Sequence, residues 1–430
     1  MQEKKRILIL GAGISGLATA FFLTKQGYDC QVLEKEKGPG GCIQTEEKEG
    51  VFLEKGPRVF QASRSESLLA LIHELELSPF LVFSKKKLPR FLFTKGSFKK
   101  MPPSFFQLFF SKFYRPLLYA LCTEWRVPPL IEDETIWEFG CRRFSRPFTE
   151  QFLDPMVLGI YAGDCKKLSV LSCFSVFKEW ERQFGCITYG FVRSLFSKKK
   201  KRGGLFSLQG GMGVLIQKLA QELSEKIFYE QEVISLQKKD GQFFVQTNQR
   251  EFIAEEVVLA LQAPRAACLL QSIAEQAALS LSTIPMQTVT SINVVIQEPL
   301  PIKGFGYLVP SKEKEPVLGV LFDSYICEDP SCIKFTIMAW GALTQEEVQE
   351  RVDCVLKKHL HLTSCCPAIL SYTVYAEGIP QYLIGHTQKI VGLQQLLPQG
   401  VYLVGNYLDG VSVNDCIFQA QKIADIFRSV

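Results

Sequence analysis

A glycine-rich stretch near the N-terminus has the residue types and spacing of an anion-binding turn. Gly11-Ala12-Gly13-Ile14-Ser15-Gly16 follows a short apolar run, Arg6–Leu10, and precedes residues whose apolar side chains recur at helical spacing. In such a turn the first glycine permits a tight bend, the second lets the backbone approach a ligand, and the third lets helix and strand pack closely. The N-terminus of the following helix offers unpaired N–H groups and a positive dipole end. The stretch therefore predicts a phosphate-binding turn.

An acidic residue at the expected distance extends this pattern. Residues Asp29–Leu33 are typical of a second buried strand, and Glu34 follows it, 23 residues after Gly11. Strand, glycine turn, helix, strand and acid together are typical of the dinucleotide-binding βαβ unit. We therefore expect Glu34 to accept hydrogen bonds from an adenosine ribose.

A second glycine-rich segment indicates which dinucleotide binds. The segment from Lys37 to Thr45 contains Gly40-Gly41 and resembles the GG-(R/K)-x-x-T extension of FAD enzymes of the amine oxidase and carotenoid desaturase group. The residue after the paired glycines is Cys42 where those enzymes have a basic residue, which places one phosphate or flavin contact in question. A second G-x-G-x-x-G for a nicotinamide cofactor is absent from the sequence. The predicted cofactor is FAD, with Gly41 and Cys42 among its contacts.

Six further segments follow in order along the chain. They are Phe52–Arg58 (FLEKGPR), Pro155–Asp164 (PMVLGIYAGD) with Leu168-Ser169, Phe206–Met212 (FSLQGGM), Gly304–Pro310 (GFGYLVP), Ile379–Tyr382 with Gly385-His386, and Gly405-Asn406 with Gly410–Ile417 (GVSVNDCI). Together these segments resemble protoporphyrinogen oxidases, a family within this group. The resemblance covers nearly the whole chain, and its middle blocks are not shared with amine oxidases or phytoene desaturases.

The resemblance implies further cofactor contacts. The closing motif is preceded by the buried-strand pattern Val401–Val404 and followed by a helical pattern, which repeats the arrangement of the first turn. The implied contacts are Gly56, Pro57, Arg58, Val233 through its backbone at the adenine ring, Gly405, and Val411, Ser412 and Val413 near the pyrophosphate or flavin ring. From the sequence alone, Val233 can equally be an ordinary strand residue.

The resemblance also implies an activity, the removal of three hydrogen pairs from a porphyrinogen, with flavin as acceptor and dioxygen as oxidant. It implies that Arg58 and Gly159 position the substrate. It also implies that the pocket for the macrocycle is lined by Leu308, Leu318 and Met338. A flat apolar macrocycle with propionate groups needs apolar walls and a cation at one edge. Arg58 can instead anchor the flavin loop or pair with an internal carboxylate. Without the resemblance, the three apolar residues indicate ordinary core.

Three alternatives stay open at this point. Coproporphyrinogen III oxidase activity on the same fold differs in the polarity of the substrate edge. An amine oxidase or carotenoid desaturase belongs to another reaction class, but neither an aromatic cage nor a covalent flavin link is evident. A non-catalytic FAD-binding protein is the third alternative, against which the intact phosphate loops argue.

The patterns predict a mixed α/β fold. A Rossmann-like FAD-binding domain is expected from residues 1–84, 203–265 and 389–430. Residues 85–202 are expected to form a mostly helical insert, and residues 266–388 a sheet-based substrate domain, because their apolar runs are strand-like.

The helical insert has the composition of a membrane-associating segment. Residues Ser104–Leu121 are rich in Phe, but Lys112 and Arg115 interrupt them, so we expect residues 95–125 to lie in the interface and not to span the bilayer. Basic clusters at Lys85–Lys87, Lys99–Lys100 and Lys198–Arg202 suit anionic headgroups, although such clusters are most often solvated loops. The expected location is the cytoplasmic face of a bacterial membrane, or the mitochondrial inner membrane in a eukaryote.

Other classes of partner are not indicated. A formal net charge of +5 on 430 residues does not favour nucleic acid. The 14 cysteines lack a repeated spacing, and no signal peptide precedes the first strand, which suggests free thiols in a reducing compartment. No metal site is expected, since His359 and His361 are interpreted as a surface pair without a third ligand. A homodimer is left open by the sequence, which does not indicate the oligomeric state.

Overall fold

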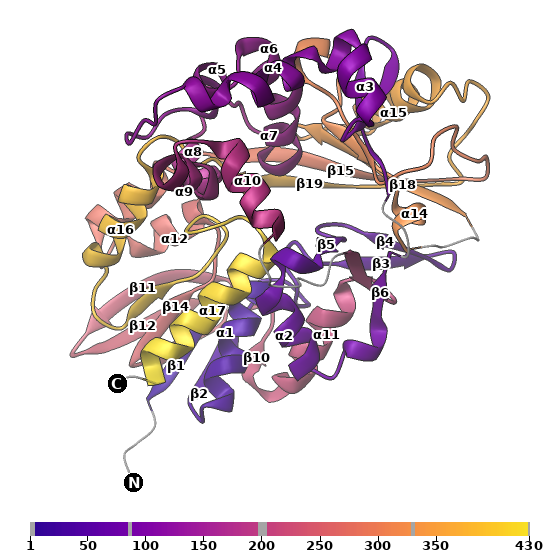
Figure 1. Cartoon of the computed structure of the whole chain (residues 1–430). Helices are drawn as coiled ribbons and strands as arrows, with labels where there is room; N and C mark the ends of the chain where they lie inside the picture. The colour runs from indigo at the N-terminus through magenta and orange to yellow at the C-terminus, as the bar shows by residue number, and fades with distance from the viewer. Residues whose placement is uncertain (1–4, 85–87, 197–203, 328–331, 429–430) are drawn as a thin grey trace. The chain divides into compact units, whose positions relative to one another are not determined.

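The computed structural model describes residues 5–84, 88–196, 204–327 and 332–428, which form two compact units (Figure 1). Each unit is assembled from segments that are far apart in the sequence. The first unit contains Met1–Val82, Leu205–Pro285 and Gln388–Val430, and the second contains Phe83–Gly204 and Met286–Thr387.

The units differ from the predicted domains in two respects. The helical insert and the substrate sheet, predicted as separate domains, belong to one unit. Residues 266–285 were expected in the substrate domain but belong to the first unit. They contain most of α12 (Ala263–Leu270) and all of α13 (Glu275–Ser282), which pack on each other through buried alanine and leucine side chains. Because α12 also packs on β11 (Val233–Lys239), the helix pair completes the first unit.

The first unit is built on a parallel sheet of five strands with the order β10-β2-β1-β14-β20. The central strand is buried from Ile7 to Leu10, as expected for a strand covered on both faces. Helices α1 and α17 pack side by side against this sheet (Figure 1). The strands are β1 (Arg6–Leu10), β2 (Asp29–Leu33), β10 (Ile227–Phe228), β14 (Glu256–Leu259) and β20 (Val401–Leu403), and the two helices are α1 (Ile14–Lys25) and α17 (Val413–Arg428).

Smaller elements complete the first unit. Three further sheets have the strand orders β11-β12-β13, β3-β4 and β5-β9-β6. Their strands are β3 (Thr45–Lys48), β4 (Val51–Glu54), β5 (Phe60–Gln61), β6 (Leu81–Phe83), β9 (Leu205–Leu208), β12 (Gln242–Thr247) and β13 (Glu251–Ala254), and the remaining helices are α2 (Glu66–Glu74), α11 (Gly213–Glu222) and α16 (His386–Leu396).

The second unit is built on a sheet of seven strands with the order β19-β15-β18-β17-β16-β7-β8. All neighbouring strands are antiparallel except β16 and β7, which are parallel. One face of the sheet buries an apolar core with α15 (Gln345–Asp353) and the π-helix η8 (Cys354–His359). The strands are β7 (Arg90–Thr94), β8 (Ser97–Met101), β15 (Met286–Ile296), β16 (Gly306–Leu308), β17 (Gly319–Leu321), β18 (Ile333–Trp340) and β19 (Ile369–Pro380).

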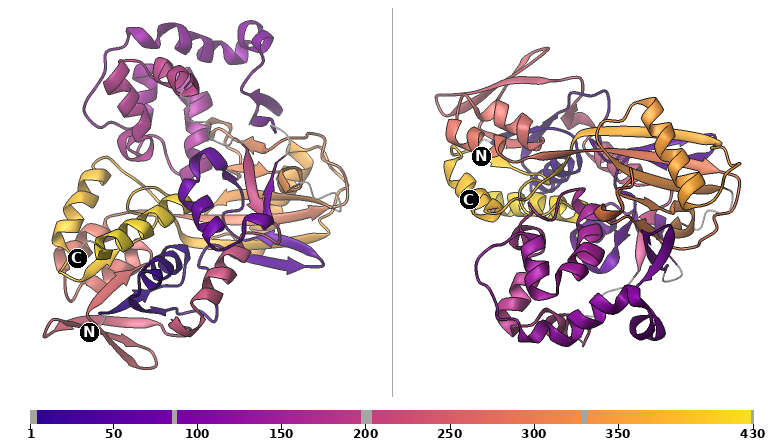
Figure 2. Two further views of the ribbon diagram at one scale, coloured as in Figure 1. Left: turned by 60° about the horizontal axis from the view of Figure 1, so that its bottom comes forward. Right: turned by 90° about the horizontal axis from the view of Figure 1, so that it is seen from above.

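The helices of residues 105–196 gather beside this sheet in the same unit (Figure 2). Helix α7 contacts strand β16, which ties the helical part to the sheet. The helices are α3 (Phe105–Phe110), α4 (Arg115–Thr123), α5 (Ile136–Arg143), α6 (Arg146–Phe148), the π-helix η5 (Thr149–Leu153), α7 (Asp154–Tyr161), α8 (Val170–Cys173), α9 (Ser175–Phe184) and α10 (Ile187–Phe196).

Buried charges hold the helical part together. The Arg143 side chain is fully buried and donates from Nε to Glu181, at 2.8 Å, and from Nη1 to Glu124, at 3.3 Å. The Glu124 carboxylate also accepts from the backbone N–H of Ile187, at 2.8 Å, at the start of α10. Burying these charges costs free energy that their mutual pairing must offset, so removing one partner leaves a buried charge uncompensated.

The predicted membrane segment lies on α3 and α4. In the part of the chain that the structure describes, no helix is both long and apolar enough to cross a bilayer. Three of the phenylalanines of α3 are more than 70% exposed: Phe105, Phe106 and Phe110. Phe113, in the same segment, packs edge-on against Phe152 and is half-buried. The basic clusters Lys85–Lys87 and Lys198–Arg202 lie outside the described residues.

Candidate functional site

The first glycine turn connects β1 to α1 with little room for side chains. Gly11 has a φ of +105°, and a Cβ there would lie 2.7 Å from the Ala260 carbonyl oxygen. A Cβ on Gly16 would lie 1.9 Å from the carbonyl oxygen of Gly11, closer than any real contact. A Cβ on Gly13 would meet no protein atom within 4 Å. Packing therefore explains why Gly11 and Gly16 are glycines, whereas Gly13 lies where a ligand is expected to approach.

The N-terminus of α1 is suited to bind phosphate. Gly13 occupies the N-cap position and provides no side-chain cap, and the first turn contains no acidic residue. The first N–H groups of a helix have no partner within the helix, and the helix dipole makes this end positive. The predicted contacts Ala12, Ile14 and Ser15 lie in this turn.

The second glycine loop lies against the first. The N–H of Gly40 donates to the Ala12 carbonyl, at 2.8 Å, and a Cβ on Gly41 would lie 3.4 Å from the Cα of Gly13. Cys42 follows and is exposed. A Cβ on Gly56 would lie 1.9 Å from the Cys42 carbonyl oxygen, so the loop packs on the segment that leads to Arg58. The structure thus brings three predicted segments together in the first unit.

Glu34 lies directly beside the first glycine turn, and the segment that leads into Val233 lies beside Glu34. The buried Glu34 carboxylate accepts from the N–H of Ala12, at 2.7 Å, and from the N–H of Glu36, at 3.0 Å. A carboxylate has about four acceptor positions, so it can still accept from a ribose. The backbone of Gln231 donates to the Glu34 carbonyl, which brings the start of β11 beside it. The Val233 carbonyl accepts from Arg265, at 2.7 Å, a partner that the sequence did not indicate.

Arg58 is buried in the first unit, and its backbone carbonyl accepts from the Ser207 hydroxyl, at 2.7 Å. This bond joins Phe52–Arg58 to the strand of the FSLQGGM segment. Pro57, beside it, is exposed. The buried position of Arg58 suits an anchor of the flavin loop, one of the three roles considered for it.

The closing motif forms a second strand-to-helix turn. It follows β20 and leads into α17, where Ser412 and Asp415 cap the helix: the Ser412 hydroxyl donates to the Asp415 carboxylate at 2.6 Å. Gly405 donates from its N–H to Gln419. The predicted contacts Val411, Ser412 and Val413 lie in this turn, at the start of a helix that packs on α1. Burial raises the pKa of the Cys416 thiol to about 12, which disfavours the thiolate that a covalent bond would require.

Two polar residues that the sequence analysis did not select support the second loop. Thr45 donates from its hydroxyl to Glu54, at 2.8 Å, and accepts from the N–H of Gly213, at 2.9 Å. Glu54 also accepts from the N–H of Met212, at 2.6 Å. Together they satisfy backbone donors at the start of α11. In the sequence, the available signal was that Glu54 is an acidic residue close to glycines. Its partner Met212 lies 158 residues further along the chain, so the sequence did not show the contact.

Four predicted substrate residues lie together in the second unit; we call them the Gly159 patch. A Cβ on Gly159 would lie 2.7 Å from the Leu308 side chain, and Leu318 donates from its N–H to the Met338 carbonyl, at 2.8 Å. Gly159 is exposed, Leu308 and Met338 are half-buried, and Leu318 is buried. The patch is thus an apolar wall on the sheet and on α7.

Polar contacts hold the Gly159 patch in place. The Trp340 indole donates to the Ala162 carbonyl, at 3.0 Å, and the Gln381 amide donates to the Tyr161 carbonyl, at 2.9 Å. A Cβ on Gly163 would lie 2.1 Å from the Gln381 side-chain oxygen. The GIYAGD and IPQY segments therefore pack on each other, a contact that the sequence does not reveal.

The fold and the first-unit site define a class of protein. One parallel sheet has two glycine-containing turns at strand-to-helix junctions, β1 to α1 and β20 to α17, and the acid Glu34 follows its strand β2. This arrangement is typical of dinucleotide-binding flavoproteins. Residues 14–426 match the family described as flavin containing amine oxidoreductase. The chain belongs to this family.

Individual proteins resemble the chain over its full length. The protoporphyrinogen oxidase of Homo sapiens is 28% identical and that of Schizosaccharomyces pombe is 27% identical, each over 98% of this chain and at least 98% of the relative. The crystal structure of a candidate protoporphyrinogen oxidase from Exiguobacterium sp. 255-15 superimposes with a TM-score of 0.86 at 22% identity, over 99% of both chains.

These findings confirm the predicted mixed α/β fold, the family resemblance, the oxidoreductase class and FAD as cofactor. The first-unit residues fit FAD, because Gly13 leaves space at an uncapped helix N-terminus and the Glu34 carboxylate lies beside the same turn. The roles of the individual site residues stay predictions.

Proposed function

We propose that the protein oxidises protoporphyrinogen IX to protoporphyrin IX in haem biosynthesis. Six electrons and six protons leave the substrate, and three molecules of dioxygen accept them to give three of hydrogen peroxide. The observation that carries the proposal is the full-length similarity to the protoporphyrinogen oxidases of Homo sapiens and Schizosaccharomyces pombe. When bound, FAD supplies the hydride acceptor, and the chemistry of that step belongs to the cofactor.

The role of the chain in this reaction is positioning. The Gly159 patch offers aliphatic and thioether atoms to a flat macrocycle, and the absence of a Cβ at Gly159 lets the Leu308 side chain pack directly against α7. Apolar walls of this kind bind a poorly soluble ring by removing its surface from water. Holding the substrate in reactive geometry is a large part of catalysis when the cofactor carries out the bond-breaking step.

Two substrates offered side by side test the proposal. The purified flavin-loaded protein is given protoporphyrinogen IX or coproporphyrinogen III in aerated buffer, and porphyrin fluorescence is followed. We expect faster oxidation of protoporphyrinogen IX, because an apolar wall favours the less charged ring. Faster oxidation of coproporphyrinogen III would assign the protein to that reaction. No oxidation of either, with FAD bound, would support a flavoprotein of another activity.

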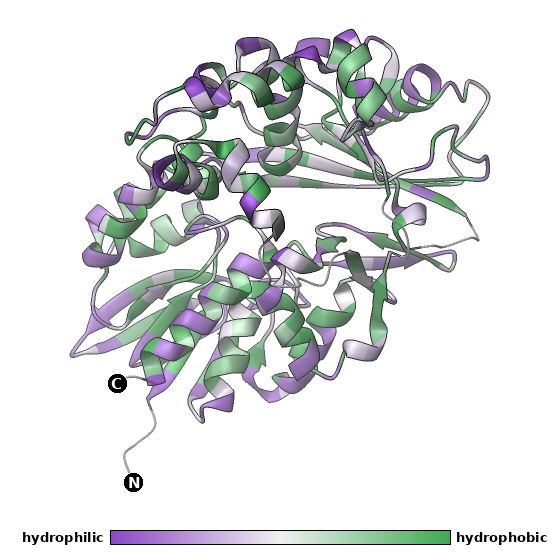
Figure 3. Cartoon of the chain, in the orientation of Figure 1, coloured by the Kyte–Doolittle hydropathy of each residue, from purple (hydrophilic) through white to green (hydrophobic). Residues whose placement is uncertain are grey.

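We also propose that the protein docks peripherally on an anionic membrane surface through α3 and α4. Figure 3 shows hydrophobic residues along α3, and the exposed side chains include Phe105, Phe106 and Phe110. Tyr119 and Trp125 are also more than half exposed, and Lys112 and Arg115 lie between Phe110 and Tyr119 in the sequence. Exposed aromatic residues with interspersed cations suit the headgroup region of a bilayer. The cytoplasmic-face or mitochondrial inner-membrane location, and a homodimer, stay predictions.

Vesicle binding tests the docking surface. Replacing Phe106 and Phe110 with serine removes the two most exposed rings of α3 and should weaken sedimentation with vesicles containing phosphatidylserine at least tenfold, since each buried ring contributes about 1.5–3 kcal/mol. The matched control is Leu279→Ser, a 65% exposed residue of α13 in the first unit, which should leave binding unchanged. Equal binding by all three proteins would contradict the proposed surface.

A further inference from the structure

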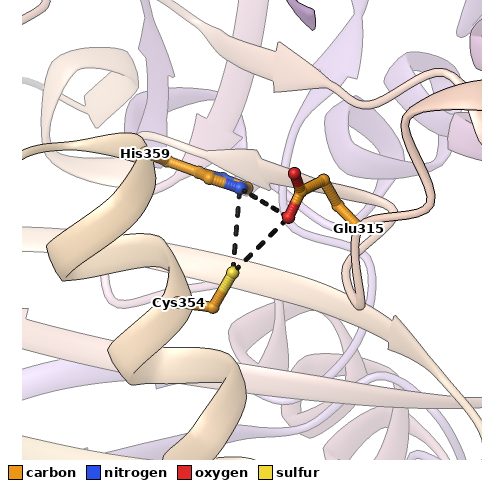
Figure 4. Close-up of side chains that lie close together, drawn as sticks. All are labelled: Glu315, Cys354 and His359. Carbon is orange, nitrogen blue, oxygen red and sulfur yellow. Dashed lines mark hydrogen bonds and ion pairs between the residues drawn. The ribbon is translucent and has the colours of Figure 1, made fainter. Parts of the chain in front are cut away.

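Three side chains that can bind a metal ion converge in the second unit (Figure 4). They are Glu315, in the segment before β17, and Cys354 and His359, the first and last residues of η8. His359 was predicted to form a surface pair with His361, and this prediction is wrong: His359 is only 1% exposed. The missing third ligand was not apparent from the sequence because Glu315 lies 39 residues before Cys354.

The distances between the three ligand atoms are close to those between the ligands of a tetrahedral zinc ion. Nε2 of His359 lies 3.5 Å from a Glu315 oxygen and 3.8 Å from Sγ of Cys354, and Sγ lies 3.7 Å from the same oxygen. Good nitrogen–oxygen hydrogen bonds are about 2.9 Å long. Ligands of a tetrahedral zinc ion, at about 2.0–2.3 Å from the metal, lie about 3.4–3.6 Å from one another. A contraction of a few tenths of an ångström would complete such a site.

The π-helix explains how two ligands five residues apart face the same point. In an α-helix, residues i and i+5 are rotated by about 140° relative to each other. The wider turn of a π-helix, closed by hydrogen bonds from i to i+5, places Cys354 and His359 one above the other. Such turns are frequent at functional sites.

Neighbouring groups orient the histidine and the carboxylate. The Tyr307 hydroxyl lies 2.8 Å from Nδ1 of His359, and the Phe93 ring packs on the imidazole with centroids 4.0 Å apart. When Nδ1–H donates to this hydroxyl, the lone pair of Nε2 points at the cluster. Lys358 donates to one oxygen of Glu315 and leaves the other facing Cys354 and His359. Metal-binding histidines are held in this way by a hydrogen bond at their second nitrogen.

We propose that Glu315, Cys354 and His359 form a binding site for one divalent transition-metal ion, for which Zn²⁺ is the best match. Thiolate and imidazole ligands favour Zn²⁺ over Mg²⁺ or Ca²⁺, which prefer oxygen ligands only. Three protein ligands leave one coordination position for water, and the cysteine proton passes to solvent on binding. The ion would join η8 to the segment before β17, the segment that also contains Leu318. This proposal does not depend on the substrate.

Zinc binding by the intact flavin-loaded protein tests the site. The protein is treated with a chelator, desalted and equilibrated with zinc buffered by a competing ligand, and bound zinc is measured by elemental analysis. X-ray absorption at the zinc edge then identifies the ligands. We expect one zinc per chain, with one sulfur at about 2.3 Å and nitrogen or oxygen at about 2.0–2.2 Å. An absorption spectrum without sulfur would overturn the proposal.

Variants distinguish this site from other thiols. Cys354→Ser and Glu315→Gln should each raise the zinc dissociation constant at least about 100-fold, and Tyr307→Phe, which removes only the bond to Nδ1, about 10- to 100-fold. Cys366→Ser, which changes an exposed cysteine outside the cluster, should bind as the unmodified protein does. Zinc should also raise the thermal midpoint of the unmodified protein and of Cys366→Ser, but not of Cys354→Ser. Equal zinc affinity for Cys354→Ser and the unmodified protein would overturn the proposal.

Discussion

The two units position their functional residues in different ways. In the first unit, the neighbour of a critical glycine is backbone: a Cβ on Gly16 would meet the Gly11 carbonyl oxygen at 1.9 Å. In the second unit, a Cβ on Gly159 would meet the Leu308 side chain at 2.7 Å, and that side chain can rotate. The second unit also relies on buried charges such as Arg143. Rigid backbone therefore shapes the first-unit glycine turns, whereas adjustable side chains shape the proposed substrate patch.

The largest expected effect concerns the buried charges of the second unit. Arg143→Met should lower the free energy of unfolding by about 3–5 kcal/mol, because Glu124 and Glu181 would remain buried without their partner. The control Arg146→Met removes an ion pair to Glu150 whose arginine is 75% exposed, and should cost less than about 1 kcal/mol. Thermal or urea unfolding measures both. Equal small losses would show that the network does not stabilise the helical part.

Gly16→Ala tests the rigidity of the first unit. The added methyl group meets backbone that cannot move without disturbing β1 and α1, so we expect a loss of about 1–3 kcal/mol in stability and of most bound flavin. Gly38→Ala is the matched control in the neighbouring loop, because a Cβ there meets no atom within 4 Å. The ratio of flavin to protein absorbance and the thermal midpoint measure the two effects. Full flavin content in Gly16→Ala would contradict the proposed packing.

Gly13→Ala separates the cofactor from the packing. Its φ of −75° suits alanine, and the new methyl group meets no protein atom. The thermal midpoint of the flavin-free protein should therefore stay unchanged, while the affinity for FAD falls about tenfold or more, an affinity loss of about 1.4 kcal/mol. Isothermal titration of the flavin-free protein with FAD measures the affinity. Unchanged affinity would place the pyrophosphate away from Gly13.

Gly159→Ala should have a smaller effect. Because Leu308 can rotate away from the new methyl group, FAD content and stability should stay near normal. The value of kcat/KM for protoporphyrinogen IX should fall about tenfold, which corresponds to about 1.4 kcal/mol. Adding Leu308→Ala removes the side chain that the methyl group displaces and should restore part of the loss. A Gly159→Ala protein with normal kcat/KM would remove Gly159 from the substrate site.

The same difference explains how much the sequence reveals. The turn from Gly11 to Gly16 and the acid at Glu34 lie close together in the chain and are constrained by backbone geometry, so their spacing predicts their structure. The Gly159 patch joins residues up to 179 positions apart, and only the family resemblance identified it. The cluster around His359 was missed because a π-helix, which sequence periodicity does not predict, aligns Cys354 with the histidine.

We propose that FAD, when bound, would supply the direct acceptor for the hydrogen that protoporphyrinogen IX loses. Mixing the two under strictly anaerobic conditions, and following flavin absorbance, tests this claim without the oxidant. We expect rapid bleaching of the oxidised flavin together with the appearance of oxidised substrate, and recovery of the flavin absorbance when oxygen is admitted. Persistent oxidised flavin in the presence of excess protoporphyrinogen IX would contradict the proposed function.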